Sequence, residues 1–188
     1  MRKLKLQVQI SVDGYIAGKN GEMDWMVWDW TDDLKEYITQ ITNPVDTILL
    51  GRNLAQGFIP YWTAALNKKE PEEGAKKMVE TTKVVFSKTL TKSEWENTVL
   101  VTGDLVDEVD KLKNQDGKDI IVYGGGKFVS SLLREGLIDE LHLLINPVAV
   151  GNGMPIFEEL KSNQNLKLRI ARQFDCGIAL LCYELKQS

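Results

Sequence analysis

Three consecutive glycines, Gly124, Gly125 and Gly126, are the residues of this 188-residue chain that point most directly to chemistry. They follow a β-type apolar run at residues 120–123 and precede an amphipathic segment typical of a helix. Glycine adopts backbone conformations that other residues avoid, and it lets the main chain approach a ligand closely. A glycine turn that leads into a helix N-terminus is a common seat for a phosphate or a dinucleotide. The alternative is a tight strand-to-helix connection without a ligand.

The two commonest phosphate-binding motifs do not match this run. A Rossmann G-x-G-x-x-G motif needs glycine where Val129 stands, and a Walker A motif needs glycine at Ile121 and Ser or Thr at Phe128. His142 is the only histidine, which excludes multi-histidine metal sites. No serine lies in a motif typical of a histidine-dependent catalytic triad. Hydride transfer from a cofactor stays compatible, because the protein then supplies binding, orientation and at most one proton donor.

Composition and patterning exclude several classes of protein. The net charge is −4 and no basic stripe is present, which argues against a nucleic-acid partner. No run of 18 apolar residues predicts a membrane span, and the alternating N-terminus predicts a strand rather than an export signal. Cys176 and Cys182, if they share one strand, lie roughly 20 Å apart, too far for a disulfide. We therefore expect a cytoplasmic protein with one domain over residues 1–188.

The elements that must position these residues alternate between strand and helix. This order predicts an α/β fold, with a mostly parallel central sheet, helices on both faces and an antiparallel hairpin at the C-terminus. Alternating apolar residues at 4–12 predict a half-buried first strand. A first helix is predicted to begin at the N-cap Thr31 and to stop at Asn43-Pro44. No single element is assigned to residues 53–71, where Pro60 and Trp62 are expected in a loop. Residues 151–155 also read as a loop. Further strands are predicted at 47–50, 83–86, 98–101, 120–123, 140–148, 166–172 and 178–185, and further helices at 72–80, 105–114 and 127–135.

Several short motifs, taken in order, resemble one known family. They are S-V-D-G-Y-I-A at residues 11–17, G-R at 51–52, F-S-K at 86–88, Y-G-G-G at 123–126, and G-L-I-D-E-L from 136 with Pro147 and G-N-G at 151–153. The chain resembles a dihydrofolate reductase-fold protein, above all the reductase domain of bacterial riboflavin biosynthesis and its stand-alone bacterial relatives. The resemblance covers nearly the whole chain. It implies a dihydrofolate reductase-like fold around an eight-stranded sheet, NADPH as cofactor, and a homodimer.

The resemblance also implies which residues bind the cofactor. Gly51 and Arg52 would touch cofactor phosphate, Ser87 and Lys88 would meet the adenosine part, and Trp25 would lie near the nicotinamide. The glycine turn would carry the diphosphate on backbone amides and would contain a cis peptide bond. The full predicted set is Ile16, Ala17, Trp25, Gly51, Arg52, Ser87, Lys88, Gly124, Gly125, Gly126, Lys127 and Phe128.

The proton donor would be a carboxylate on the first helix, where Asp32 and Asp33 compete with water. At about 100° per residue, Asp33 lies beside the apolar face of that helix, whereas Asp32 points away from it. Asp33 is therefore the predicted catalytic residue, and partial burial should raise the pKa of its carboxyl group. The alternative is that both carboxylates simply favour the helix N-terminus.

Three positions depart from the family pattern. Leu54 replaces a threonine that holds cofactor phosphate in relatives, while Tyr123 and Phe58 replace acidic residues of the riboflavin reductase. The predicted function is an NADPH-dependent reductase that transfers a hydride to a small conjugated heterocycle of pterin or pyrimidine type. The resemblance implies an activity similar to that of 5-amino-6-(5-phosphoribosylamino)uracil reductase. The alternatives are an NADP- or pterin-binding protein with little or no catalysis, and a partner-binding protein that uses the tryptophans Trp28, Trp30 and Trp62.

Overall fold

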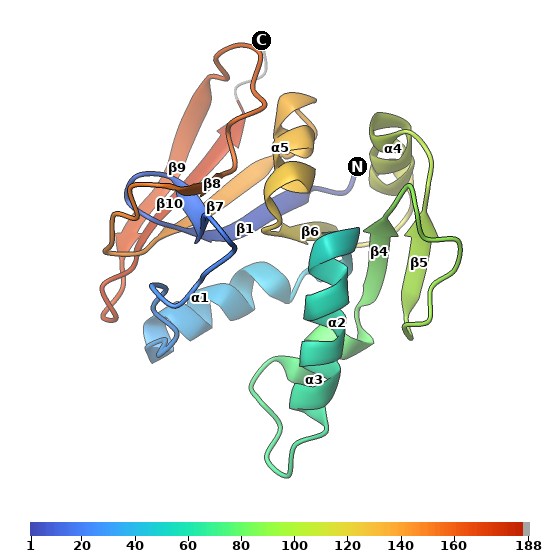
Figure 1. Cartoon of the computed structure of the whole chain (residues 1–188), viewed down its shortest axis with the longest axis horizontal. Coiled ribbons are helices and arrows are strands. Elements are labelled where there is room, and N and C mark those ends of the chain that lie inside the picture. Colours follow the sequence, from blue (N-terminus) through green and yellow to red (C-terminus); the bar gives the residue numbers. More distant parts are fainter. Residues whose placement is uncertain (186–188) are drawn as a thin grey trace.

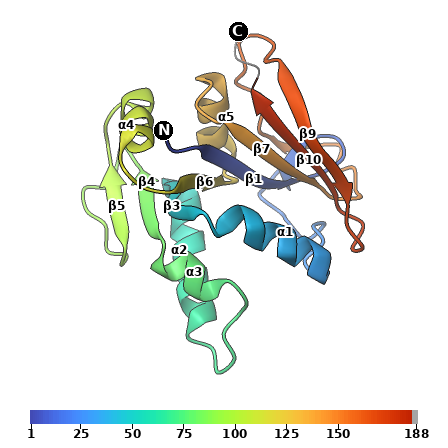
Figure 2. The same ribbon diagram turned by 180° about the vertical axis from the view of Figure 1, so that it is seen from behind.

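A single eight-stranded sheet organises the chain. The computed structural model describes residues 1–185, and its sheet has the strand order β5-β4-β3-β6-β1-β7-β10-β9 (Figures 1 and 2). All neighbouring pairs are parallel except those of β10, which runs antiparallel to both β7 and β9. The α/β fold, the mostly parallel sheet and the C-terminal hairpin are confirmed. The strands of this sheet are β1 (Leu4–Ile10), β3 (Val45–Gly51), β4 (Thr82–Phe86), β5 (Thr98–Val101), β6 (Asp119–Tyr123), β7 (Glu140–Ile145), β9 (Leu166–Gln173) and β10 (Ala179–Leu185).

Helices cover both faces of the sheet, as predicted (Figure 1). The helices α4 (Leu105–Asn114) and α5 (Gly126–Arg134) pack on one face against the largest apolar cluster. The other face carries α1 (Asp32–Thr42), α2 (Arg52–Leu66) and α3 (Ala75–Glu80), which build two separate clusters. Within residues 1–185, none of the helices is both long enough and apolar enough to cross a bilayer.

The first strand is buried on both of its faces, so the prediction of a half-buried strand was wrong. β1 lies between β6 and β7, and its apolar residues face α4 and α5. Its polar residues Lys5 and Gln7 face the α1 side, yet each is only 7% exposed. Alternation therefore reflected two different buried environments, because the polar side of the strand is covered by α1 rather than by water.

Residues 52–66 form one continuous helix, which corrects the loop expected around Pro60. Proline lacks the N–H that would bond the carbonyl four residues earlier and usually disrupts a helix interior. Here Pro60 lies on the exposed face of α2, where water can solvate the freed carbonyl, while Ala55 and Ile59 are buried. Burial of the apolar stripe therefore outweighs the local cost of the proline.

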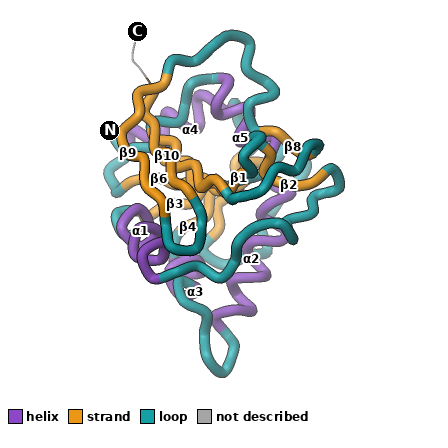
Figure 3. Tube along the Cα trace, turned by 90° about the vertical axis from the view of Figure 1, so that its left-hand side faces the viewer, coloured by secondary structure: helices purple, strands orange, loops and turns teal. Residues whose placement is uncertain are grey.

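Residues 151–155, which were predicted to form a loop, contribute a strand to a second, two-stranded sheet. β2 (Tyr15–Gly18) runs antiparallel to β8 (Gly153–Pro155), and Figure 3 shows the two side by side. Gly153 is required at this pairing, because a Cβ there would lie only 2.2 Å from the carbonyl oxygen of Ala17. This close approach explains the glycine of the G-N-G motif and could not be read from the sequence alone.

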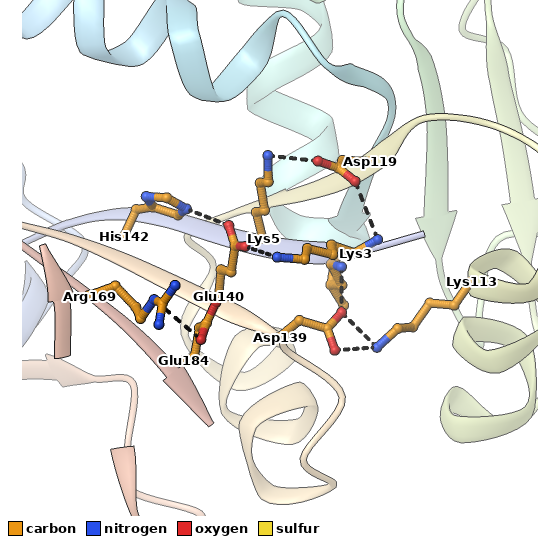
Figure 4. A network of polar contacts seen from close by, with 10 residues as sticks. Lys3, Lys5, Lys113, Asp119, Asp139, Glu140, His142, Arg169 and Glu184 are labelled. Carbon is orange, nitrogen blue, oxygen red and sulfur yellow. Dashed lines mark hydrogen bonds and ion pairs between the residues drawn. The ribbon is translucent and has the colours of Figure 1, made fainter. Parts of the chain in front are cut away.

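The amino-terminal edge of the sheet is fastened by ion pairs (Figure 4). Lys113 on α4 pairs with Asp139 at 2.7 Å, and Lys5 pairs with Asp119 at 2.7 Å. Glu140 pairs with Lys3 and contacts His142, and the hydrogen bond with His142 is the main cause that lowers the pKa of Glu140 to about 2. The acidic pair of the G-L-I-D-E-L motif thus has a structural role at the edge opposite to the glycine turn.

Candidate functional site

Two helices begin at the carboxyl edge of the sheet with free backbone donors. α2 starts directly after β3 with Gly51 as N-cap, and α5 starts after β6 with Gly125 as N-cap. Neither helix receives a side-chain cap from any described residue, whereas the aspartate Asp104 caps α4 by accepting from two backbone amides. The first amides of a helix have no internal partner, and the helix dipole adds partial positive charge at that end. The edge therefore offers two anion-binding helix ends.

The two helix ends lie in direct contact. A Cβ on Gly51 would lie 2.9 Å from Cβ of Phe128 in the first turn of α5, closer than real side chains pack. A Cβ on Gly125 would lie 3.6 Å from Leu54 in the first turn of α2. Gly51 is thus required for the close approach of the helices. Because the helix ends meet, one elongated anion could contact both of them.

At only one of the three positions of the glycine triplet does the backbone conformation require glycine. Gly125 has φ of 120°, a region that side-chain-bearing residues rarely adopt. Cβ atoms on Gly124 and Gly126 would make ordinary contacts with Val8 and Ile16, at 3.5 and 3.9 Å. Peptide bonds in the described chain are all trans, so the expected cis bond was wrong.

A cation and two hydroxyl groups gather beside the start of α2. Arg52 donates from Nη1 to Oγ1 of Thr89 at 2.9 Å, which links α2 to the connection after β4. The Ser87 side chain is buried and accepts from the backbone amides of Thr89 and Leu90, so it shapes this turn. Lys88 is exposed next to it. The sequence prediction included Arg52, Ser87 and Lys88 but missed Thr89, which only the fold brings to Arg52.

The S-V-D-G turn is held by a network centred on Asp13. Ser11 donates to its carboxylate at 2.6 Å, and the backbone amides of Val150 and Gly151 donate to it at 3.0 and 2.7 Å. These bonds, led by that of Ser11, lower the pKa of Asp13 to about 2. Asp13 therefore fastens the turn after β1 to the loop after β7. That turn leads into β2, where Ile16 and Ala17 are buried and the side chain of Ile16 lies beside Gly126.

The tryptophan-rich segment between β2 and α1 is tied to the end of β7. Asn146 is fully buried, and its Oδ1 accepts from the backbone amide of Val27 at 2.8 Å. Trp25 is half-buried, and its indole donates to the carbonyl of Glu22. Trp30 packs on the α1 cluster, and Trp28 is 58% exposed. The three tryptophans therefore have different environments. No sequence pattern indicates the anchoring role of Asn146, which depends on a contact between residues more than 100 positions apart.

Asp33 is placed at the start of α1 but carries the opposite pKa shift to that expected. It accepts hydrogen bonds from the Thr31 hydroxyl at 2.5 Å, from the Leu34 amide at 2.8 Å and from the Asp175 amide at 3.2 Å. These bonds, with that of Thr31 the largest, lower the pKa of Asp33 because they favour its ionised form. The expectation of a raised pKa was wrong. The bond to Asp175 gives this carboxylate a structural role between α1 and the β9–β10 turn.

The two residues that replace family acids contact each other. The ring of Phe58 on α2 stacks on that of Tyr123 at the end of β6, with centroids 5.4 Å apart. The Tyr123 hydroxyl contacts Sδ of Met78 at 3.5 Å, and burial raises the pKa of this phenol. An apolar aromatic pair therefore includes the residue that directly precedes the glycine turn in the chain.

Comparisons with known proteins settle the family. The family described as the RibD C-terminal domain matches residues 2–180. The chain belongs to this family. It is 35% identical over 187 residues to the uncharacterized protein YyaP of Bacillus subtilis (strain 168), covering 97% of this chain and 94% of YyaP. It is also 26% identical over 179 residues to the uncharacterized protein YwjB of the same organism, covering 95% of this chain and 96% of YwjB.

Solved structures share the fold at lower identity. A putative riboflavin biosynthesis protein from Shewanella sp. PV-4 matches with a TM-score of 0.74 at 24% identity, over 100% of both chains. A diaminohydroxyphosphoribosylaminopyrimidine deaminase/5-amino-6-(5-phosphoribosylamino)uracil reductase from Thermotoga maritima matches with a TM-score of 0.72 at 18% identity. That match covers 98% of this chain and 57% of the Thermotoga chain. The RibD C-terminal domain family is reductase-like, and these neighbours confirm the fold.

Proposed function

We propose that this chain is an NADPH-dependent reductase that transfers a hydride to a small conjugated heterocycle of pterin or pyrimidine type. The observation that carries the proposal is the contact between two uncapped helix N-termini at Gly51 and Gly125. A diphosphate is an elongated anion that two such ends can bind together. Membership of a reductase-like family supports the same reading.

The residues around the helix ends fit a phosphorylated dinucleotide. The bound cofactor would supply the hydride, and the chain would supply binding and orientation. Backbone amides of the first turns of α2 and α5 would hold the diphosphate. Arg52, already bonded to Thr89, would hold a further phosphate, and exposed Lys88 would add positive charge. Cations at this place favour NADPH over NADH, because they attract the ribose 2′-phosphate that only NADPH carries. A carboxylate at this place would instead favour the free ribose hydroxyl of NADH.

The test compares NADPH and NADH binding to an Arg52→Gln variant. Loss of one charge-assisted hydrogen bond should weaken NADPH binding about tenfold or more, while NADH binding stays within about twofold. The matched control is Arg134→Gln, which removes an arginine of α5 that pairs with Glu135 and Glu159 away from the start of the helix. Equal losses for both nucleotides would argue against a role of Arg52 in phosphate recognition.

A substrate panel separates catalysis from binding alone. An NADP- or pterin-binding protein without turnover is the second candidate, because the stacked Phe58 and Tyr123 replace charged residues and Asp33 is held in its ionised form. Following NADPH oxidation with pterins, pyrimidines and quinones distinguishes the two. Turnover with a flat heterocycle supports the reductase, whereas tight NADPH binding without oxidation of any panel member supports the second candidate.

The proton donor, the oligomeric state and the cellular location remain predictions of the same proposal. Asp33 stays a predicted proton donor, and Asp33→Asn should lower turnover while NADPH affinity is spared. The homodimer and the cytoplasmic location also stay predictions. Sedimentation at several protein concentrations tests the first of these two, and fractionation of cells that express the chain tests the second.

A further inference from the structure

A cavity of about 500 Å³ lies beside the C-terminal half of α2, and none of its lining residues belongs to the glycine turn. Its lining comes from α2, from α3 and the start of β4, and from the connection between β4 and β5. The start of β4 is at the amino edge of the sheet, whereas the helix ends described above are at the carboxyl edge. The volume is about three times the ~150 Å³ that holds a benzene ring and lies in the usual range for small-molecule sites.

Three aromatic side chains line the cavity. Phe58 and Trp62 come from α2, with their rings 6.1 Å apart in an edge-to-face arrangement, and Trp95 comes from the β4–β5 connection. Met78 of α3 adds a polarizable side chain. Flat, apolar rings stack well on such surfaces, because aromatic side chains offer large contact areas in defined geometry. The walls therefore favour a planar aromatic body.

A buried cation lines the same cavity. Lys83 is 2% exposed, and its ammonium donates to the backbone carbonyls of Met78 and Val79 at the end of α3. No carboxylate within residues 1–185 forms an ion pair with it, and burial lowers the pKa of this ammonium without any opposing acid. A buried charge without a counter-ion is costly, and an anion that reaches it would compensate that cost.

The rim of the cavity limits the charge of such an anion. Glu94 and Glu96 are exposed lining residues, so they add negative potential where a ligand would enter. For a phosphate of charge close to −2, the attraction to Lys83 and the repulsion by Glu94 and Glu96 both double relative to a carboxylate. The cost of removing an anion from water rises with the square of its charge, so the buried position beside Lys83 favours the carboxylate. We propose that this cavity is a second small-molecule site, which binds a planar aromatic carboxylate with its ring between Trp62 and Trp95 and its carboxylate toward Lys83.

Three matched probes test the proposal on the wild-type chain by isothermal titration calorimetry. They are 2-naphthoate, the uncharged 2-naphthamide and 2-naphthyl phosphate, which share one ring system. The carboxylate should bind at least about tenfold more tightly than the amide, as expected for a charge-assisted hydrogen bond, and more tightly than the phosphate. Absence of naphthoate binding at millimolar concentration, or equal affinity for carboxylate and amide, would overturn the proposal.

Variants locate the binding. Lys83→Met should abolish the preference for carboxylate and leave the amide affinity within about twofold, whereas the exposed-lysine control Lys161→Met should change neither. Trp95→Leu should weaken both probes, and this variant decides the location if Lys83→Met does not fold. Retained preference in folded Lys83→Met, or unchanged binding in Trp95→Leu, would place the probe elsewhere. Displacement of naphthoate by NADP⁺ would place it at the carboxyl edge and also overturn the proposal.

Discussion

Gly51→Ala should disrupt the contact between the two helix ends. The new Cβ would lie 2.9 Å from Cβ and 3.1 Å from Cγ of Phe128, about 0.6 Å short of the ~3.5 Å at which carbon atoms begin to pack well. Neither partner atom can move far, because Cβ of Phe128 is fixed by the backbone of α5. Overpacking of this kind costs about 1–3 kcal/mol in the free energy of unfolding. The protein can relieve this overpacking only by moving the start of α2 away from α5.

A matched control lies in the same helix. Gly57 is exposed, and apart from its neighbours in the chain and the nearby backbone of α2, no described heavy atom lies within 4 Å of the Cβ that alanine would add. Gly57→Ala should therefore stabilise the protein by about 0.5–1 kcal/mol, because alanine has the higher helix propensity. Urea unfolding of the two variants should give free-energy changes of opposite sign. NADPH titration, well below the melting temperature of each variant, should show at least about tenfold weaker binding for Gly51→Ala alone.

Two results would refute the reasoning at different steps. If Gly51→Ala is as stable as Gly57→Ala, the helix ends are not packed as closely as described. If Gly51→Ala is destabilised but binds NADPH with wild-type affinity, the contact between the helices exists, and the proposed binding of the diphosphate at the two helix ends is wrong. Phe128→Ala is itself destabilising, because the ring packs on the core and on Phe86. In a double-mutant cycle, however, Gly51→Ala should cost less in the Phe128→Ala background, since the Cγ contact is gone while the Cβ contact remains.

Three further predictions concern the supports of the site. The pKa of Asp13 is about 2 in the folded chain and 3.8 ordinarily, so its stabilising contribution is present above pH 3.8 and is lost as the pH falls toward 2. Asp13→Asn should therefore flatten the pH dependence of the unfolding midpoint in this window, and an unchanged profile would contradict this. Gly153→Ala should break the β2–β8 pair, because its Cβ would meet the Ala17 carbonyl oxygen at 2.2 Å, and faster proteolysis after β2 is the measurement. Tyr37→Phe removes the partner of buried His142 Nδ1, a bond of 2.6 Å, and should cost about 1–3 kcal/mol in urea unfolding; a change below about 0.5 kcal/mol would count against it.

Periodicity predicted most elements but failed where tertiary contacts decide. The strand at 98–101 and the helix at 105–114 have their predicted bounds, because each has a strong local pattern and clear stop signals. The helix through Pro60 was missed, since only packing against β3 and β4 shows that the proline faces water. The β2–β8 pair was missed because each strand is too short to show a pattern and joins a partner more than 130 residues away.

The candidate site divides in the same way. Motif order was enough to predict the fold and the family, and both are confirmed. The roles of individual acidic residues were harder to predict from the sequence. Asp33 lies where helical periodicity puts it, yet hydrogen bonds from Thr31 and from the distant Asp175 lower its pKa rather than raise it.

The sequence by itself determined that a glycine turn would lie between a strand and a helix, and that no common phosphate motif would explain it. It also determined the alternation of strands and helices, because hydrophobic periodicity and turn residues are local properties. Only the tertiary structure brought the start of α2 against the start of α5, Thr89 to Arg52, and Lys83 into an aromatic cavity. These contacts join residues far apart in the chain, and they depend on strand order and side-chain packing, which no local pattern encodes.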